Sequence, residues 1–153
     1  MSMSVLDRLK ELGVELPQST PPAAVYVPCV RANGFLFTAG QTPKVNGVLQ
    51  YRGKADAMPI EEAQKAARMC AINCLTIVNN NGGLDNVERI VKVTGFVNCG
   101  LDFTKQSQVI DGASKFLGEV FGEEGAHARS AVGVASLPGD ATCEVEMIVQ
   151  MKG

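Results

Sequence analysis

The feature that most constrains the fold is an alternation of residue types near the C-terminal end of the chain. The stretch HARSAVGVASLPGDATCEVEMIVQM runs from His127 to Met151. A period of two is that of β-strands, whose successive side chains point to opposite faces. The sequence LPGD at 137–140 divides the stretch, because Pro fixes φ and Gly accepts a positive φ. We therefore predict two strands, joined as a hairpin, that complete the domain.

The two rows of side chains on these strands differ in character. On the second strand, Glu144 and Glu146 alternate with apolar residues, and on the first strand Arg129 shares a row with Ala131 and other small residues. If the apolar rows form the core face, the arginine and both glutamates point the other way. We therefore expect the face of the sheet away from the core to carry small and charged side chains.

The rest of the chain alternates between strand and helix patterns. The predicted segments are a helix over about 3–13 capped by Ser4, a connector over 17–24, a hairpin over 25–40 around Asn33-Gly34, a turn at Asn46-Gly47, a helix over 60–80, a strand over 87–99 and a helix over 105–121. This order predicts an α+β fold with one mixed β-sheet and two helices packed on one face. We expect residues 1–153 to form a single domain, with the helix over 3–13 as an extension. The uncovered face of the sheet would need a partner, which favours a closed symmetric assembly.

Both long helices carry an apolar stripe with helical spacing. The stripe residues are Ala63, Ala67, Cys70, Cys74, Ile77 and Val78 in the first helix and Val109, Ala113, Phe116, Leu117 and Val120 in the second. Such stripes are typical of helices that pack one face against a core.

The composition excludes several classes of protein. The 153 residues carry a net charge of −2 and have no basic run interleaved with aromatic residues, which disfavours nucleic-acid binding. Five cysteines are scattered without a C-x-x-C pair, and His127 is the only histidine, so a metal site is hard to assemble. Free core thiols suit a reducing compartment, and the charged N-terminus matches neither a signal peptide nor a membrane span. We therefore expect a cytoplasmic protein that does not bind membranes.

Three stretches together resemble the RidA (YjgF) family. They are VYVPCV, which contains Tyr26, FTAGQTP, which contains Gly40, and the C-terminal HARSAVGVASLPGDATCEVEMI. The resemblance covers about residues 20–151. It implies a chorismate-mutase-like fold and a homotrimer in which three sheets form a central barrel and ligands bind in clefts between subunits. A face of small residues would then allow neighbouring sheets to approach closely.

The resemblance also implies an activity. Family members with deaminase activity hydrolyse 2-imino or 2-enamino acids to 2-oxo acids and ammonia, without a metal or an organic cofactor. Arg129 matches the arginine that binds the substrate carboxylate, and a guanidinium suits this role because its fork makes two parallel charge-assisted hydrogen bonds. Glu144 matches the glutamate that orients water or moves its proton, and Tyr26 matches a tyrosine that closes the cleft. Gly40 and Ala131 match positions that line the substrate.

This chain departs from the best-studied branch of the family at several of these positions. Ala131 replaces a cysteine, Ala39 replaces a serine, and the asparagine of the second helix has no clear counterpart among Val109-Ile110-Asp111. The loop over 121–128 is also longer than usual. We therefore expect a relative of the deaminase branch with a shifted or reduced substrate preference.

Structural interpretations of the same residues remain open at this point. Arg129 could be a surface residue paired with a glutamate, Glu144 could pair with an arginine, and Tyr26 could be a half-buried packing residue. Glu146 fits a structural salt bridge or hydrogen bond at an interface, and His127 fits a loop or interface position better than a catalytic base.

Two other functions are also open. The loss of the cysteine and serine contacts is consistent with a non-catalytic trimer that binds small carboxylate metabolites. A ribonuclease, an activity attributed to some family members, is disfavoured by the acidic pI of about 5.4 and by the lack of a second histidine beside His127.

Overall fold

The computed structural model describes residues 3–19 and 25–153. Its helices and strands are α1 (Val5–Glu11), β1 (Cys29–Ala32), β2 (Phe35–Thr38), β3 (Lys44–Val45), β4 (Val48–Leu49), α2 (Ile60–Asn81), β5 (Val87–Asn98), α3 (Gln106–Phe121), β6 (Ala128–Val134) and β7 (Cys143–Met151). Short 3₁₀ turns lie at Ala55–Ala57, Leu84–Asn86, Gly122–Gly125 and Pro138–Asp140. The predicted connector over 17–24 lies partly outside the described residues.

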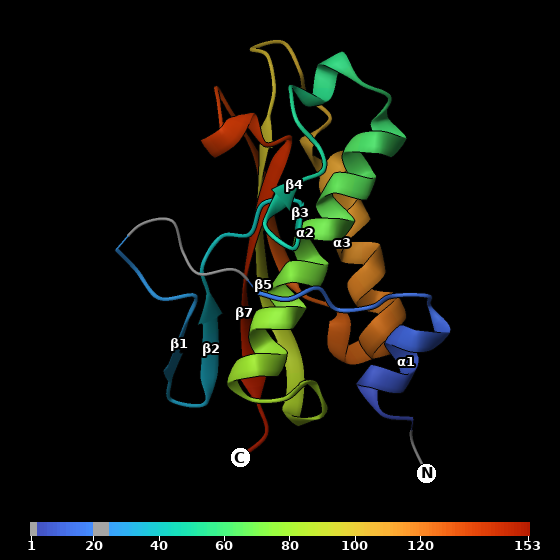
Figure 1. The fold of residues 1–153 in the computed structure, drawn as a ribbon, viewed down its shortest axis with the longest axis vertical. Helices are drawn as coiled ribbons and strands as arrows, with labels where there is room; N and C mark the ends of the chain where they lie inside the picture. Colours follow the sequence, from blue (N-terminus) through green and yellow to red (C-terminus); the bar gives the residue numbers. More distant parts are fainter. Residues whose placement is uncertain (1–2, 20–24) are drawn as a thin grey trace.

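The main sheet has five strands in the order β1-β2-β7-β5-β6. β6 is parallel to β5, and the other neighbours are antiparallel, so the sheet is mixed. Helices α2 and α3 lie side by side on one face of this sheet, and α1 lies beside α3 (Figure 1). The α+β prediction, with both long helices on one face, is therefore confirmed.

The prediction of a C-terminal hairpin is wrong. β5 lies between β6 and β7 and pairs with both, so β6 and β7 are not neighbours. The crossover through α3 brings β6 alongside β5 in parallel, and residues 135–142 then pass beyond the end of β5 to reach β7. The local turn was predicted correctly, since Gly139 has a φ of 66°. The alternation identifies strands but does not say which strands pair.

Local signals placed the other elements well. The Ser4 side chain accepts a hydrogen bond from the Asp7 N–H at 3.1 Å and so caps α1 as predicted. Asn33 and Gly34 have φ values of 49° and 79° between β1 and β2. These angles are those of the tight hairpin turn that an Asn-Gly pair favours.

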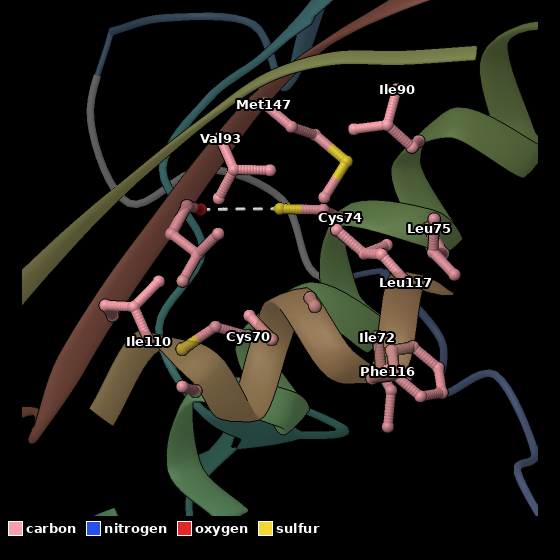
Figure 2. Close-up of a cluster of buried hydrophobic side chains, with 14 of the residues drawn as sticks. Cys70, Ile72, Cys74, Leu75, Ile90, Val93, Ile110, Phe116, Leu117 and Met147 are labelled. Carbon is pink, nitrogen blue, oxygen red and sulfur yellow. Dashed lines mark hydrogen bonds between the residues drawn. The ribbon is translucent and has the colours of Figure 1, made fainter. Parts of the chain in front are cut away.

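The core lies between the sheet and the two long helices, and every residue of the predicted helical stripes is buried. Figure 2 shows the centre of this core, where Leu75 of α2 and Phe116 of α3 pack with Val93 and Met147 of the sheet. All five cysteines are free, and four of them are buried, which confirms the prediction of core thiols for Cys70 and Cys74.

Two glycines allow α3 to pack closely. A Cβ on Gly112 of α3 would lie 2.0 Å from the backbone oxygen of Gln64 in α2, so only glycine permits this helix contact. A Cβ on Gly95 of β5 would lie 2.5 Å from the Ile110 side chain, so Ile110 packs directly over the strand. These contacts fix α3 against α2 and the sheet, and thereby fix the polar side of α3 that faces β6.

The face of the sheet away from α2 and α3 carries exposed apolar side chains. Val30, Phe37 and Val132 are 52%, 42% and 45% exposed. Scattered exposed apolar residues are ordinary, but three on one sheet face form a surface that favours association. Within residues 3–19 and 25–153, no helix is long and apolar enough to cross a membrane.

Candidate active site

Three of the five predicted site residues line one cavity. Tyr26, Gly40 and Glu144 surround a space of about 180 Å³ beside β7, where β2 has ended. Its wall also includes Asn73 of α2 and Pro138 from the connection between β6 and β7. The structure therefore brings together segments that are more than a hundred residues apart in the sequence.

Glu144 is the chemically distinctive group of this cavity. It lies on β7 opposite Phe96, on the sheet face away from the helices, and is half-buried. Burial, with a smaller contribution from the neighbouring Glu146 carboxylate, raises the pKa of Glu144 above its usual value. Its carboxylate makes no hydrogen bond or ion pair with any residue that the structure describes. A carboxylate in this state is suited to accept and return a proton.

Gly40 provides the space in which the Glu144 carboxylate lies. A Cβ at this position would come within 2.6 Å of Glu144 Oε2. The segment is held against β7 by two backbone hydrogen bonds between Gln41 and Val145, at 2.8 and 3.0 Å. Gly40 is therefore required for close approach of the loop to the carboxylate, and its place beside the substrate stays a prediction.

Asn73, which was not among the predicted site residues, positions the same loop from the helix side. Its Nδ2 donates to the backbone oxygens of Thr42 and Lys44 at 3.0 and 2.9 Å. It is buried, within the continuous run of buried residues from Cys70 to Val78 of α2. A lone amide within a run of buried apolar residues is the signal that could have identified it, because a buried amide needs partners.

The opposite wall is fixed by a second buried amide. Asn98, at the end of β5, is fully buried and donates to Asp140 Oδ1 and to the Ala141 backbone oxygen, both at 3.0 Å. Its Oδ1 accepts from Lys54 Nζ at 2.9 Å, and the same Nζ donates to the Ala135 oxygen at 2.6 Å. These bonds hold both ends of the connection that carries Pro138 to the cavity.

Arg129 does not lie in this cavity, which corrects our expectation about the two faces. Arg129 lies opposite Val93 of β5, and Val93 lies opposite Met147 of β7. All three side chains therefore point to the face of the sheet that the helices cover. Glu144 lies three residues before Met147 on β7 and therefore points to the other face. The expectation that Arg129 and the glutamates share a face is wrong. It assumed that the Val132 row of β6 faces the core, whereas Val132 is 45% exposed and the row of Arg129 and Ala131 faces the helices.

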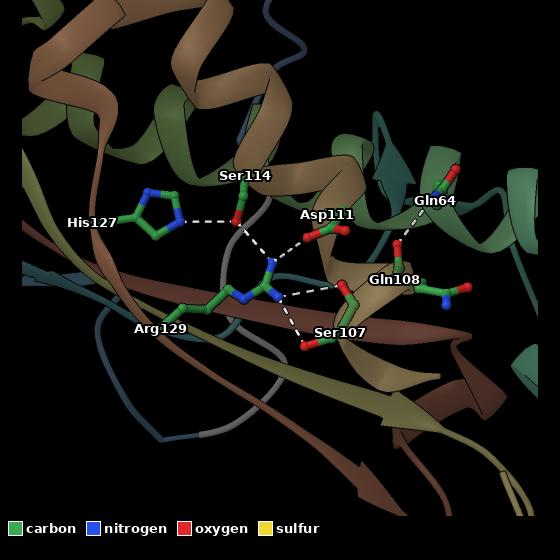
Figure 3. Close-up of polar contacts among 7 residues, drawn as sticks. All are labelled: Gln64, Ser107, Gln108, Asp111, Ser114, His127 and Arg129. Carbon is green, nitrogen blue, oxygen red and sulfur yellow. Dashed lines mark hydrogen bonds and ion pairs between the residues drawn. The ribbon is translucent and has the colours of Figure 1, made fainter. Parts of the chain in front are cut away.

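The Arg129 guanidinium instead contacts the polar side of α3 (Figure 3). Nη1 donates to Asp111 Oδ1 at 2.9 Å and to Ser114 Oγ at 3.1 Å. Nη2 donates to the Ser107 backbone oxygen at 3.3 Å and to its Oγ at 3.1 Å. The three α3 residues have a spacing of four and then three, which places them on one side of the helix. The pairing interpretation of Arg129 is thus correct in kind, with an aspartate as the partner.

His127 extends this network and is not free to act as a base. Its Nδ1 is 2.6 Å from the Gly125 carbonyl oxygen, which can only accept, so Nδ1 carries the proton. Ser114 then donates to Nε2 at 2.8 Å while it accepts from Arg129. Burial, with a smaller effect of the nearby Arg129 charge, lowers the pKa of His127.

The remaining predicted residues have simple surroundings. Ala131 lies opposite Gly95 on the helix side of β6, packs against the core and does not line the cavity. Tyr26 is 53% exposed, which is the half-buried state of the alternative interpretation, and it also lines the cavity. Glu146 is exposed and forms no ion pair with any described residue. Among residues 3–19 and 25–153, no group of His, Cys, Asp and Glu could hold a metal ion.

Comparison with known proteins identifies the family. A family model described as "YjgF/chorismate_mutase-like, putative endoribonuclease" matches residues 6–151. The chain belongs to the YjgF (RidA) family. The YjgF-family resemblance is therefore confirmed over nearly the whole chain, and the fold agrees with it.

Individual relatives agree with this assignment. Protein TCP17 of Trypanosoma cruzi is 42% identical over 151 residues, which cover 96% of this chain and 94% of that protein. The RutC family protein slr0709 of Synechocystis is 31% identical over 136 residues, covering 88% and 92% of the two chains. The crystal structure of Atu1372 from Agrobacterium tumefaciens is 40% identical, with a TM-score of 0.90 and coverage of 97% and 92%. This YjgF-family chain is thus similar to its relatives over nearly their full lengths.

Proposed function

We propose that this protein hydrolyses 2-imino and 2-enamino acids to 2-oxo acids and ammonia in a cleft between subunits of a homotrimer. The observation that carries the proposal is the Glu144 carboxylate, which is half-buried, has a raised pKa and lies without a described partner against Gly40. A structural carboxylate would be expected to have a partner at this degree of burial.

The chemistry requires one group that can accept and return a proton. In a protonated 2-imino acid the C=N carbon is electrophilic, and water adds to it while Glu144 takes one of the water protons. Glu144 then passes that proton to the amino nitrogen and takes the proton of the newly added hydroxyl group, so that the C–N bond breaks and ammonia leaves as the C=O bond forms. An enamine first takes up a proton on carbon to give the imine. Positioning and proton transfer suffice for these steps.

The carboxylate of the substrate needs a cation, and within one chain Arg129 is on the wrong face to supply it. In a ring of identical subunits, each contact joins two different surfaces, so the Arg129 edge of one subunit can approach the Glu144 cavity of the next. The exposed Val30, Phe37 and Val132 supply apolar area for such a contact. We therefore place Arg129 and Glu144 of one active site on different subunits, with Tyr26 closing the cleft.

The first experiment follows the loss of an imine generated in situ by an amino-acid oxidase. The wild-type protein should accelerate it, and Arg129→Ala and Glu144→Gln should each abolish the acceleration. The absence of acceleration with several imino acids would remove the proposed activity.

A second experiment tests the shared site. The Arg129→Ala and Glu144→Gln subunits are co-expressed or refolded together. Random mixing restores about one quarter of the sites if each site takes Arg129 and Glu144 from different subunits, and none if one chain supplies both. If the two variants assemble together as the wild type does but the mixture remains inactive, the subunit arrangement proposed here is wrong.

A non-catalytic trimer that binds small carboxylates is the second candidate. Ala131 and Ala39 favour it, because they replace the cysteine and serine of the family's best-studied branch while Arg129 is kept. This function predicts that 2-oxobutanoate raises the melting temperature through Arg129 while no imine is consumed. An RNA-cleavage assay with the same variants tests the activity named in the family description.

A further inference from the structure

The occupied state of Arg129 is the least expected feature of the site. A guanidinium has five N–H donors. In the structure, four of them are used, two by Ser107, one by Ser114 and one by Asp111. Only Nε–H lacks a partner among the described residues. A carboxylate that approaches Arg129 therefore meets a group whose two terminal nitrogens are already satisfied.

The partners differ in how strongly they compete with an incoming carboxylate. Ser107 and Ser114 are neutral, whereas Asp111 is charged and lies 2.9 Å from Nη1. All of these hydrogen bonds have a charged donor, but only the one to Asp111 also joins two opposite full charges, whose Coulomb attraction adds to the hydrogen bond. The ion pair is also only partly exposed, with 20% of the Arg129 side chain and 39% of the Asp111 side chain accessible, so water screens it incompletely. Asp111 is thus the main competitor for the guanidinium.

We propose that Asp111 determines the substrate specificity of this site by occupying the Arg129 guanidinium until a substrate carboxylate takes its place. This inference rests on the proposed function, since it assigns Arg129 to substrate binding. A carboxylate that contacts only Arg129 gains little binding free energy, because each hydrogen bond it accepts from Nη1 replaces one that Nη1 already makes. A ligand with further contacts to the cavity can displace Asp111. The site therefore selects imino acids that fit the whole cleft over the general pool of small carboxylates.

The geometry also indicates how a carboxylate begins to displace Asp111. The free Nε–H and an Nη2 donor lie on one edge of the guanidinium, where the Nη2 bonds go to the uncharged Ser107 at 3.1–3.3 Å. A carboxylate can first contact this edge, and the negative charge of Asp111 beside it opposes that approach. The edge formed by Nη1 and Nη2 becomes available only when Asp111 moves.

The test is Asp111→Asn, which keeps an oxygen that accepts from Arg129 but removes the competing charge. The affinity for 2-oxobutanoate, measured by calorimetry, should rise about tenfold, which corresponds to about 1.4 kcal/mol. In the imine assay KM should fall by a similar factor with little change in kcat. This is expected when a change affects binding of the substrate and of the transition state equally. A residue that only supports the fold would change melting temperature without this division between KM and kcat.

The matched control is Glu119→Gln, which removes the same charge from an exposed position on the same helix. It should leave binding and KM unchanged, which separates competition at Arg129 from a general loss of negative charge. In the double variant Asp111→Asn/Arg129→Ala, the gain in affinity should disappear.

The outcomes separate this inference from the proposed function. If the wild type hydrolyses imines and Asp111→Asn binds carboxylates no better than wild type, the inference is overturned and the activity stands. If neither the wild type nor any variant consumes imine, but Asp111→Asn binds carboxylates more tightly through Arg129, the activity is overturned and the inference stands. Weaker binding in Asp111→Asn would show that Asp111 orients Arg129 for the ligand, which also overturns the inference.

Discussion

Gly40→Ala tests the link between the loop and the Glu144 carboxylate most directly. A Cβ on Gly40 would lie 2.6 Å from Glu144 Oε2 and 2.9 Å from Cδ, whereas ordinary contacts begin at 3.4 Å. The carboxylate must therefore move by about 0.8 Å. It can do so, because it is the far end of a flexible side chain and has no described partner to hold it.

The expected effect is large on catalysis and small on stability. A displacement of about 1 Å at a reacting group can cost about 100-fold in rate. We therefore expect kcat/KM for imine hydrolysis to fall about 100-fold, which corresponds to about 2.7 kcal/mol of transition-state stabilisation. The free energy of unfolding should change by less than about 1 kcal/mol, as for most substitutions outside the core.

The assay is the loss of imine generated in situ, measured beside thermal unfolding of the same samples. Gly118→Ala is the matched control, because a Cβ there meets nothing within 4 Å and the residue lies in α3. It should keep full activity and gain up to about 1 kcal/mol from helix propensity. Full activity in Gly40→Ala would refute the reasoning that the position of Glu144 limits the reaction.

Four further predictions follow from the same contacts. Glu144→Gln should raise the melting temperature while it abolishes activity, because a carboxyl whose pKa is higher in the folded state reduces stability when ionised; an unchanged or lower melting temperature would contradict this. Glu146→Gln should move the acidic limb of the pH–kcat/KM profile to lower pH, since the Glu146 charge helps to raise the pKa of Glu144; a fixed limb would contradict the coupling. Gly112→Ala should lower the free energy of unfolding by about 3 kcal/mol in denaturant titrations, because its Cβ would meet the Gln64 backbone oxygen, and wild-type stability would show that the helices separate easily. His127 has a lowered pKa in the folded state, so its contribution to stability should be lost as pH falls below its ordinary value of 6.5, and His127→Gln should reduce this pH dependence in unfolding titrations between pH 8 and 5.

The sequence by itself determined the elements that depend on local chemistry. The two helical stripes, the Ser4 cap and the Asn33-Gly34 turn follow from spacing and backbone preferences within a few residues. The mixed sheet with both helices on one face also follows from element order. These features are local because each helix turn and each tight turn is closed by residues near it in the chain.

The candidate site could be predicted only in part. The family motifs placed Tyr26, Gly40 and Glu144 together, and the structure brings them to one cavity. Asn73 and Asp111, which hold the loop and the arginine, were not identified, because their importance depends on partners distant in the sequence.

Only the tertiary structure decided which way Arg129 points. A period of two says that Arg129 and its neighbours alternate between faces, but it does not say which row meets the core. That choice depends on the register across the sheet, where Arg129 lies opposite Val93 of β5 and Val93 lies opposite the buried Met147 of β7. Strand pairing is non-local, so the residues of β6 alone do not say whether the Arg129 row or the Val132 row meets the core.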